Sequence, residues 1–278
     1  MYSILAAALA VGLAAAPGDA VDDYVKQSRA ALTSGDADKA LELAEKAVAA
    51  DPNSASALFV RGLAKAALHK SADAIADYDQ ALKIDPKKAE ICDSRGSEEF
   101  KLGKFAESVA DFDRYLETAP KQAPGHWRRG ISLYYLGRYD DGRKQFAAYQ
   151  EIDANDVENA VWHFLCAARA DGVEKARASM LKVGKDTRIP MMPVYDLYRG
   201  KAKPEDVMSA ALEADGTEAE RKERLFMAHL YLGLYFDATG DKKQALEHIS
   251  LAAHKYYVDG YMGDVARVHE TVLMKESK

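Results

Sequence analysis

The sequence is poor in cysteine, and the two cysteines that it has lie far apart. Cys92 and Cys166 are the only ones among 278 residues. A small secreted domain held together by disulfides carries many more. Neither cysteine has a second one nearby that could complete a thiolate metal site. We therefore expect both to pack in the core, and we expect no metal.

The sequence also has no block of basic residues. Its 38 Lys and Arg are set against 44 Asp and Glu, which gives a formal net charge of -6. Binding along a row of phosphates needs clustered positive charge, so a nucleic-acid partner is not expected. With 48% hydrophobic and 29% charged residues, the composition is that of a folded chain.

Catalytic and cofactor motifs are missing as well. The chain has no GxSxG nucleophile elbow, no HExxH and no cysteine beside a recognisable base. Its glycines follow no predicted strand, so they do not form a phosphate-binding loop. We expect His126 and His229 in the helix core, whereas His248 and His254, six residues apart on one predicted helix, are expected on the surface. We predict no enzyme activity and no cofactor.

The first twenty residues, MYSILAAALAVGLAAAPGDA, are typical of a secretory signal peptide. They run apolar from Ile4 to Ala16 and then reach Pro17 and a small-residue ending at Ala20. The run is shorter than the roughly 18 to 20 residues that cross a bilayer as a helix. We therefore expect cleavage after Ala20 and a periplasmic or secreted protein.

A period of 34 residues organises the chain. Prolines recur at 52, 86 and 120, and glycines recur at 62, 96 and 130. An arginine stands before each of these glycines. The register gives four units without insertion or deletion: 21–54, 55–88, 89–122 and 123–156.

Each unit is predicted to be a helix, a tight turn and a second helix. The turn residues are Gly35, Gly103 and Gly137, with His69 as the exception, and small residues follow where two helices must meet. Units of this length and pattern resemble the tetratricopeptide repeat (TPR) family. The resemblance implies an all-α, right-handed TPR superhelix (α-solenoid) of about six helix-turn-helix units with a capping helix.

The pattern weakens after residue 156 and then returns. Residues 157–225 are predicted to hold a divergent TPR unit with its turn at Gly172, and then short helices, one of which begins at Pro204. Residues 226–278 are predicted to hold a late TPR unit and a closing helix from Tyr261 to Met274. This order of elements is similar to the NlpI family of bacterial periplasmic lipoproteins. That resemblance implies an adaptor, usually a homodimer, that brings a periplasmic protease together with cell-wall hydrolases. No cysteine stands near residue 20, so no lipid anchor is expected.

The TPR resemblance also implies which residues face the concave groove, where a partner would bind. The segment HWRRGISLYYLGRY stands out because its Trp127 does not recur in other repeats. Two alternatives remain open, since these side chains either line an open groove or pack against the C-terminal helices. The predicted partner-binding residues are Phe59, Leu63, Asp93, Ser97, Phe100, Lys101, Trp127, Ile131, Tyr134 and Tyr135.

We predict an exported scaffold or adaptor that binds a protein or peptide, with a function in envelope or cell-wall processing implied by the resemblance. The first alternative is a structural subunit that assembles with itself. The second is a hydrolase whose active site has no recognisable motif.

Overall fold

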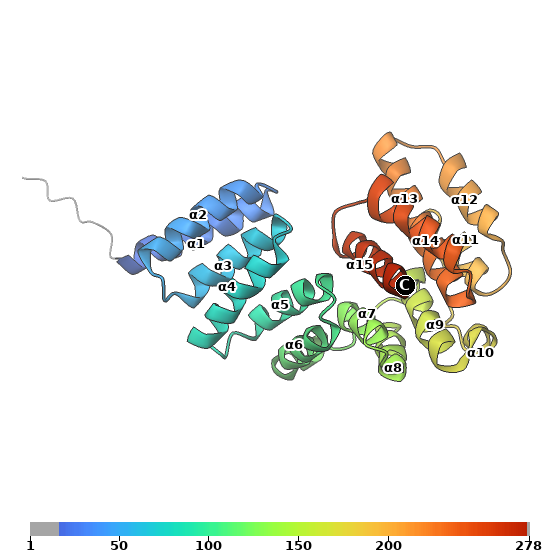
Figure 1. Ribbon diagram of the computed structural model, residues 1–278, viewed down its shortest axis with the longest axis horizontal. Helices are drawn as coiled ribbons and strands as arrows, with labels where there is room; N and C mark the ends of the chain where they lie inside the picture. Colours follow the sequence, from blue (N-terminus) through green and yellow to red (C-terminus); the bar gives the residue numbers. More distant parts are fainter. Residues whose placement is uncertain (1–16, 277–278) are drawn as a thin grey trace, which may run out of the picture. The chain divides into compact units, whose positions relative to one another are not determined.

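The computed structural model describes residues 17–276, and within that range the chain is all helical, with no strand (Figure 1). Fifteen α-helices follow one another, largely as consecutive packed pairs. This confirms the predicted all-α class. The described helices belong to two compact units, which are divided between Ile91 and Cys92.

The first unit contains two helix pairs. Most of the predicted signal peptide, residues 1–16, lies outside the described residues, while residues 17–20 form the first turn of α1. Asp36 and Ser54 cap the helices that follow them, because their side chains accept from otherwise unpaired backbone N–H groups. The helices of this unit are α1 (Pro17–Thr33), α2 (Ala37–Ala50), α3 (Ala55–Ala67) and α4 (Ser71–Ile84).

The turns within the repeats have the backbone conformation that their residues suggest. Gly35, Gly103 and Gly137 have φ angles of 80°, 73° and 79°, in the left-handed region where glycine has no Cβ penalty. His69 takes the same place in the second repeat with a φ of 57° and is the only described non-glycine residue with positive φ. The predicted exception is therefore a turn of the same kind.

A second set of glycines is required by close packing rather than by backbone angle. A Cβ placed on Gly62 would come within 2.4 Å of the Tyr78 ring, and one on Gly130 within 2.6 Å of the Phe146 ring. Such distances are well inside van der Waals contact. The 34-residue period of these glycines thus marks the point where the first helix of a repeat meets an aromatic ring of the second helix of the same repeat.

The arginines before Gly62 and Gly96 tie the two helices of a repeat together. Arg61 binds Asp77 through two hydrogen bonds of 2.6 and 2.9 Å. Arg95 binds Asp111 in the same way, at 2.6 and 2.7 Å. Both aspartates are buried, so these paired bonds compensate the removal of a charge from water.

The second unit contains eleven helices, the first of which begins just before the unit boundary. It holds the large buried aromatic core around Trp162, Tyr198 and Tyr231. The helices are α5 (Ala89–Lys101), α6 (Phe105–Thr118), α7 (Trp127–Tyr135), α8 (Tyr139–Tyr149), α9 (Val157–Asp171), α10 (Val173–Ala178), α11 (Met191–Tyr198), α12 (Pro204–Glu213), α13 (Glu218–Thr239), α14 (Lys242–Ser250) and α15 (Tyr261–Glu276).

The C-terminal repeats differ from the regular ones in helix length. The helix predicted at Pro204 does begin there, whereas α10, after the Gly172 turn, has only six residues. Helix α13 has 22 residues and begins eight residues before the predicted unit, because Thr217 and Glu220 form a capping box there. A short π-helical segment, Leu251–Lys255, separates α14 from the loop before α15.

The histidines divide between core and surface, with one correction. His126 and His229 are buried, as predicted. The surface prediction for His248 is wrong, because it is half-buried and its Nδ1 lies 2.9 Å from Nδ1 of His229. His254 is exposed and pairs with Glu270 at 2.9 Å.

Candidate functional site

The predicted groove residues of the first unit are largely covered. The Phe59 ring is buried against Tyr78, with 5.8 Å between ring centres, and the Arg29 guanidinium lies 5.4 Å from its centre. Leu63 is half-buried. These two side chains therefore offer little free surface to a partner.

The polar members of the predicted groove, Asp93 and Ser97, belong to a network between α5 and α7. Both carboxylate oxygens of Asp93 accept from one guanidinium nitrogen of Arg128, at 2.7 and 2.9 Å, and Oδ1 also accepts from Nε2 of His126 at 2.8 Å. Arg128 also donates to Ser97 at 2.8 Å. Burial would raise the pKa of Asp93, but the bonds from His126 and Arg128 lower it overall. The network holds two successive repeats together.

Helix α15 folds back onto the predicted groove of α5 and α7. Tyr261 stacks on Phe100, with 5.1 Å between ring centres and 19° between ring planes, and it meets Trp127 edge-on at 5.2 Å. Lys101 bridges Glu98 at 2.7 Å and approaches Asp264 of α15 at 3.4 Å. The chain's own C-terminus thus occupies this part of the groove.

The remaining groove aromatics also point into the protein. Ile131 and Tyr134 are buried. The Tyr134 hydroxyl accepts from Arg169 at 3.2 Å, and Tyr135 contacts Nδ1 of His269 in α15 at 3.0 Å. Burial raises the pKa of Tyr135 well above its ordinary value. Of the two alternatives left open by the sequence, the structure shows packing against the C-terminal helices at these positions.

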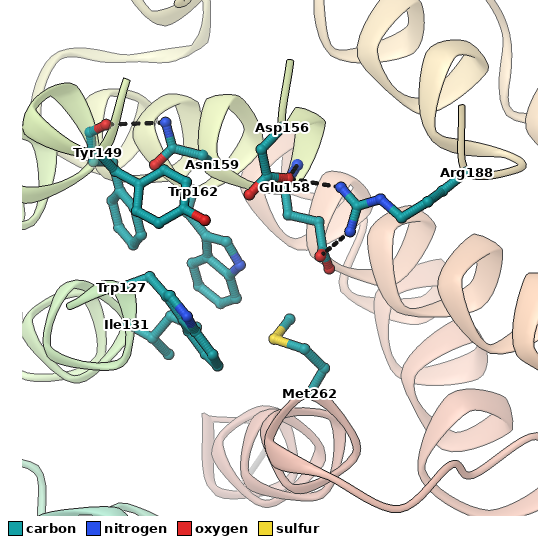
Figure 2. A pocket seen from close by; sticks show the side chains of 10 residues that line it. Trp127, Ile131, Tyr149, Asp156, Glu158, Asn159, Trp162, Arg188 and Met262 are labelled. Atoms are coloured by element: carbon teal, nitrogen blue, oxygen red, sulfur yellow. Dashed lines mark hydrogen bonds and ion pairs between the residues drawn. The ribbon is translucent and has the colours of Figure 1, made fainter. Parts of the chain in front are cut away.

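One pocket remains at the edge of this covered region, and we call it the tryptophan pocket. Figure 2 shows Trp127, Trp162 and Met262 arranged around it, with Arg188 entering from the opposite side. Its volume is about 210 Å³. The lining residues are Trp127, Ile131, Phe146, Tyr149, Asp156, Glu158, Asn159, Trp162, Arg188 and Met262.

The apolar wall comes from helices that are distant in sequence. Trp127 is the first residue of α7, Trp162 lies in the second turn of α9, and Met262 is the second residue of α15. Trp162 is held by Phe146, which stacks at 6.3 Å, and by Tyr134, which meets it edge-on at 5.5 Å. The wall is thus rigid on the α9 side and closed by a terminal helix on the other.

The charged rim is a cluster of three carboxylates around one guanidinium. Arg188 pairs with Asp156 at 2.7 Å, with Glu158 at 2.7 Å and with Asp186 at 2.6 Å (Figure 2 shows the first two). Asp156 also caps α9 by accepting from the backbone of Glu158. The cluster fixes the loop that carries Arg188 to the start of α9.

Burial and hydrogen bonding shift the pKa values of the rim carboxylates in opposite directions. Burial raises the pKa of Glu158, even though Tyr231 and Arg188 both donate to its carboxylate. Burial would also raise the pKa of Asp186, but the hydrogen bonds from Arg188 and from the backbone of Val157 lower it overall. The rim thus sets three carboxyl groups against one guanidinium.

Sequence reasoning found Trp127 and Ile131 but missed the rest of the pocket. Trp162 falls in the divergent repeat, where the column pattern no longer assigns a face. Arg188 and Met262 come from an irregular loop and from the terminal helix, which the repeat register does not cover. The signal that could have pointed to Trp162 is rarity, because Trp127 and Trp162 are the only tryptophans in the chain.

A wider hollow of about 810 Å³ lies elsewhere in the second unit, around the start of α13. Its walls include Arg221, Lys222, Lys255 and Tyr256. None of the described residues lining it has a buried polar atom without a partner. We therefore place the candidate site at the tryptophan pocket.

Residues 17–276 contain neither a metal-binding cluster nor a membrane-spanning helix. No group of three or more His, Cys, Asp or Glu side chains there is arranged to hold a metal ion. None of the helices in that range combines the length and the apolar character that crossing a membrane requires.

Comparisons with known proteins agree on the fold. A family model described as tetratricopeptide repeat matches residues 25–89 and 94–157. No curated protein sequence matches the chain.

Three solved structures are similar at low sequence identity. A tetratricopeptide repeat protein from Parabacteroides merdae has a TM-score of 0.56 at 17% identity, covering 92% of this chain and 100% of its own. MamA from Desulfovibrio magneticus has a TM-score of 0.53 at 19% identity, covering 59% and 92%. YrrB, described as a TPR protein with an unusual peptide-binding site, has a TM-score of 0.53 at 17% identity, covering 70% and 97%. The matched repeats in residues 25–157 and the consecutive helix pairs together show that the chain has the fold of tetratricopeptide repeat proteins.

Proposed function

We propose that this protein is a non-enzymatic adaptor that binds a protein or peptide by taking one of its side chains into the tryptophan pocket. The observation that supports this most directly is the pocket itself, because it places two tryptophans and a charged rim around one cavity. Tryptophan and arginine are the residues that most often concentrate binding energy at interfaces.

The size of the cavity favours a single side chain over a small-molecule ligand. Its volume of about 210 Å³ lies below the roughly 300 to 1,000 Å³ of typical small-molecule sites. It is about seven times the roughly 30 Å³ that one water molecule occupies in the liquid. One long side chain fits this space, with the rest of the partner outside on the rim.

Helix α15 covers part of the concave face and so limits the surface that is open to a partner. Because Tyr261 and His269 occupy the groove beside Phe100 and Tyr135, a partner cannot lie along that part of the concave face while α15 is docked. Trp127 is the one predicted groove aromatic that is both only half-buried and part of the pocket wall. We therefore assign it the central role in binding.

We also propose that the protein is exported and acts in the cell envelope. The support is the apolar run from Ile4 to Ala16 and the small-residue ending at Ala20. Intact-mass measurement of the native protein tests this, with a mature chain beginning at Val21 as the expected result. A chain that still begins at Met1 in a cytoplasmic fraction would contradict export.

Partner capture from an envelope extract, followed by mass spectrometry, tests the binding proposal. We expect Trp127→Ala to weaken capture by about 1 to 4 kcal/mol, the range of interface hot spots. The matched control is Lys144→Ala, because that side chain is 77% exposed and lies outside the tryptophan pocket. Its effect should stay within about 0.5 kcal/mol. Equal capture by the wild type and Trp127→Ala, with melting curves that show both folded, would refute the proposal.

The alternative of a self-assembling subunit has a separate signature. Light scattering on the purified protein would then show a closed or growing oligomer, and Trp127→Ala would change its size. A monomer that captures a partner favours the adaptor.

A further inference from the structure

Two buried polar atoms in the tryptophan pocket have no hydrogen-bond partner among residues 17–276. They are Nε1 of Trp162 and Oδ1 of Asn159, in residues that are 2% and 4% exposed. Most buried polar groups in folded proteins are paired, and an unpaired one costs free energy. A pocket that holds one unpaired donor and one unpaired acceptor is suited to a ligand that supplies both partners.

The direction of the Asn159 amide follows from its neighbour. Its Nδ2 donates to the backbone carbonyl of Phe146 at 3.0 Å. A carbonyl can only accept, so the NH₂ group must lie on that side and Oδ1 must face away from it. Figure 2 shows the indole nitrogen of Trp162 on the side of its ring that faces Glu158 and Met262.

The available side-chain chemistries can be compared with this donor and acceptor. An ammonium has donors only and leaves Trp162 Nε1 unpaired, while a carboxylate has acceptors only and would sit beside Asp156 and Glu158. A purely apolar group leaves both atoms unpaired. A hydroxyl has both functions, but on a single oxygen that must reach both atoms, and a neutral imidazole has both, but is joined to its backbone by only one methylene. A neutral carboxamide has an acceptor oxygen and two N–H donors on separate atoms, and in glutamine it stands on a stem of two methylenes, so it satisfies both and leaves an apolar stem for the wall.

We propose that the partner side chain which enters the tryptophan pocket is a glutamine. This inference rests on the proposed binding function and specifies its ligand. The carboxamide oxygen accepts from Trp162 Nε1, and the NH₂ group donates to Asn159 Oδ1. The apolar stem of glutamine lies against Trp127 and Met262, which form the apolar wall. Asparagine carries the same group on a shorter stem and reaches less far.

The tryptophans make this testable without an identified partner. Because Trp127 and Trp162 are the only two in the chain, a ¹⁵N–¹H spectrum of the full-length protein contains two indole signals, both from the pocket. We would titrate with butyramide, which carries the carboxamide and stem of glutamine. The comparison probes are butyrate, butylamine and 2-pentanone, the last being the same shape without N–H donors. Propionamide tests the shorter stem of asparagine.

We expect butyramide to shift both indole signals and to bind in the millimolar range, as suits so few atoms. Butyrate, butylamine and 2-pentanone should bind about three- to tenfold more weakly, since each leaves a buried atom unpaired or brings a repelled charge. Trp162→Phe should weaken butyramide by a similar factor, read from the remaining Trp127 signal.

Two results would overturn the inference. The first is 2-pentanone or butyrate binding as tightly as butyramide, and the second is butyramide leaving the Trp162 signal unmoved. In either case the adaptor proposal stands if Trp127→Ala still loses partner capture, and it falls separately if capture is unchanged. The probe comparison needs no variant, so it holds even if Trp162→Phe does not fold.

Discussion

The docking of α15 on the concave face can be tested by truncating Tyr261 to alanine. The Tyr261 ring stacks on Phe100 at 5.1 Å and meets Trp127 edge-on at 5.2 Å. Each such aromatic pair is worth about 0.5 to 1.5 kcal/mol beyond the area it buries. Truncating a buried aromatic costs about 3 to 5 kcal/mol. Because the Tyr261 residue is half-buried, we expect Tyr261→Ala to lower the free energy of unfolding by about 3 kcal/mol, the lower end of this range.

Hydrogen exchange and tryptophan emission together measure this loss. In Tyr261→Ala the amides of α15 should exchange faster, because the helix loses its main contact with α5 and α7. The emission should move to longer wavelength, because Trp127 becomes more exposed to water. Denaturant unfolding of the second unit should give the free-energy difference.

Two controls bracket the Tyr261 result. Tyr261→Phe keeps the ring and should retain both aromatic contacts. Met274→Ala, also in α15 but 47% exposed, should stay within about 0.5 kcal/mol of the wild type. If Tyr261→Ala left the exchange of α15, the emission and the unfolding midpoint unchanged, α15 would not be docked as described.

Three further predictions concern stability. Asp237, 1% exposed at its side chain and paired with Arg169, has a lowered pKa despite burial because His269, Lys242 and Arg169 stabilise its charge. The contribution of the Asp237 charge to the free energy of unfolding is therefore present above pH 3.8 and is lost as the pH falls further. Asp237→Asn should lower the free energy of unfolding, measured with denaturant at neutral pH, by about 3 to 5 kcal/mol. Burial raises the pKa of Glu99 from 4.5 to about 7, so Glu99→Gln should raise the melting temperature at about pH 8 and much less at about pH 5. An equal change in melting temperature at the two pH values would contradict the raised pKa of Glu99. Gly130→Ala, whose Cβ would lie 2.6 Å from the Phe146 ring, should lower stability by about 1 to 3 kcal/mol, and an unchanged melt would contradict that packing.

The sequence predicts the regular part of the fold well, because the repeat signals are local. A closely packed glycine and the aromatic ring that it meets, such as Gly62 and Tyr78, lie within one 34-residue unit. The left-handed turn at His69 and the buried place of His126 follow from register alone. Each contact there is between neighbouring helices, so one period specifies it.

The candidate site could be predicted only in part, because its contacts are not local. Tyr135 and His269 are 134 positions apart, and no column of the repeat relates them. The same holds for Arg188 and Met262, which reach the pocket from a loop and a terminal helix. The groove positions implied by the TPR family assume an open concave face, and α15 fills that face beside Phe100.

The central claim is that a partner binds through the pocket formed by Trp127 and Trp162. The most direct measurement is the ¹⁵N–¹H spectrum of the two indole groups, recorded on the full-length protein with and without the partner that it captures. The account predicts that both signals move when the partner binds, because both tryptophans line the pocket. Saturating binding that leaves both signals where they were would show that the partner binds elsewhere and would contradict the account.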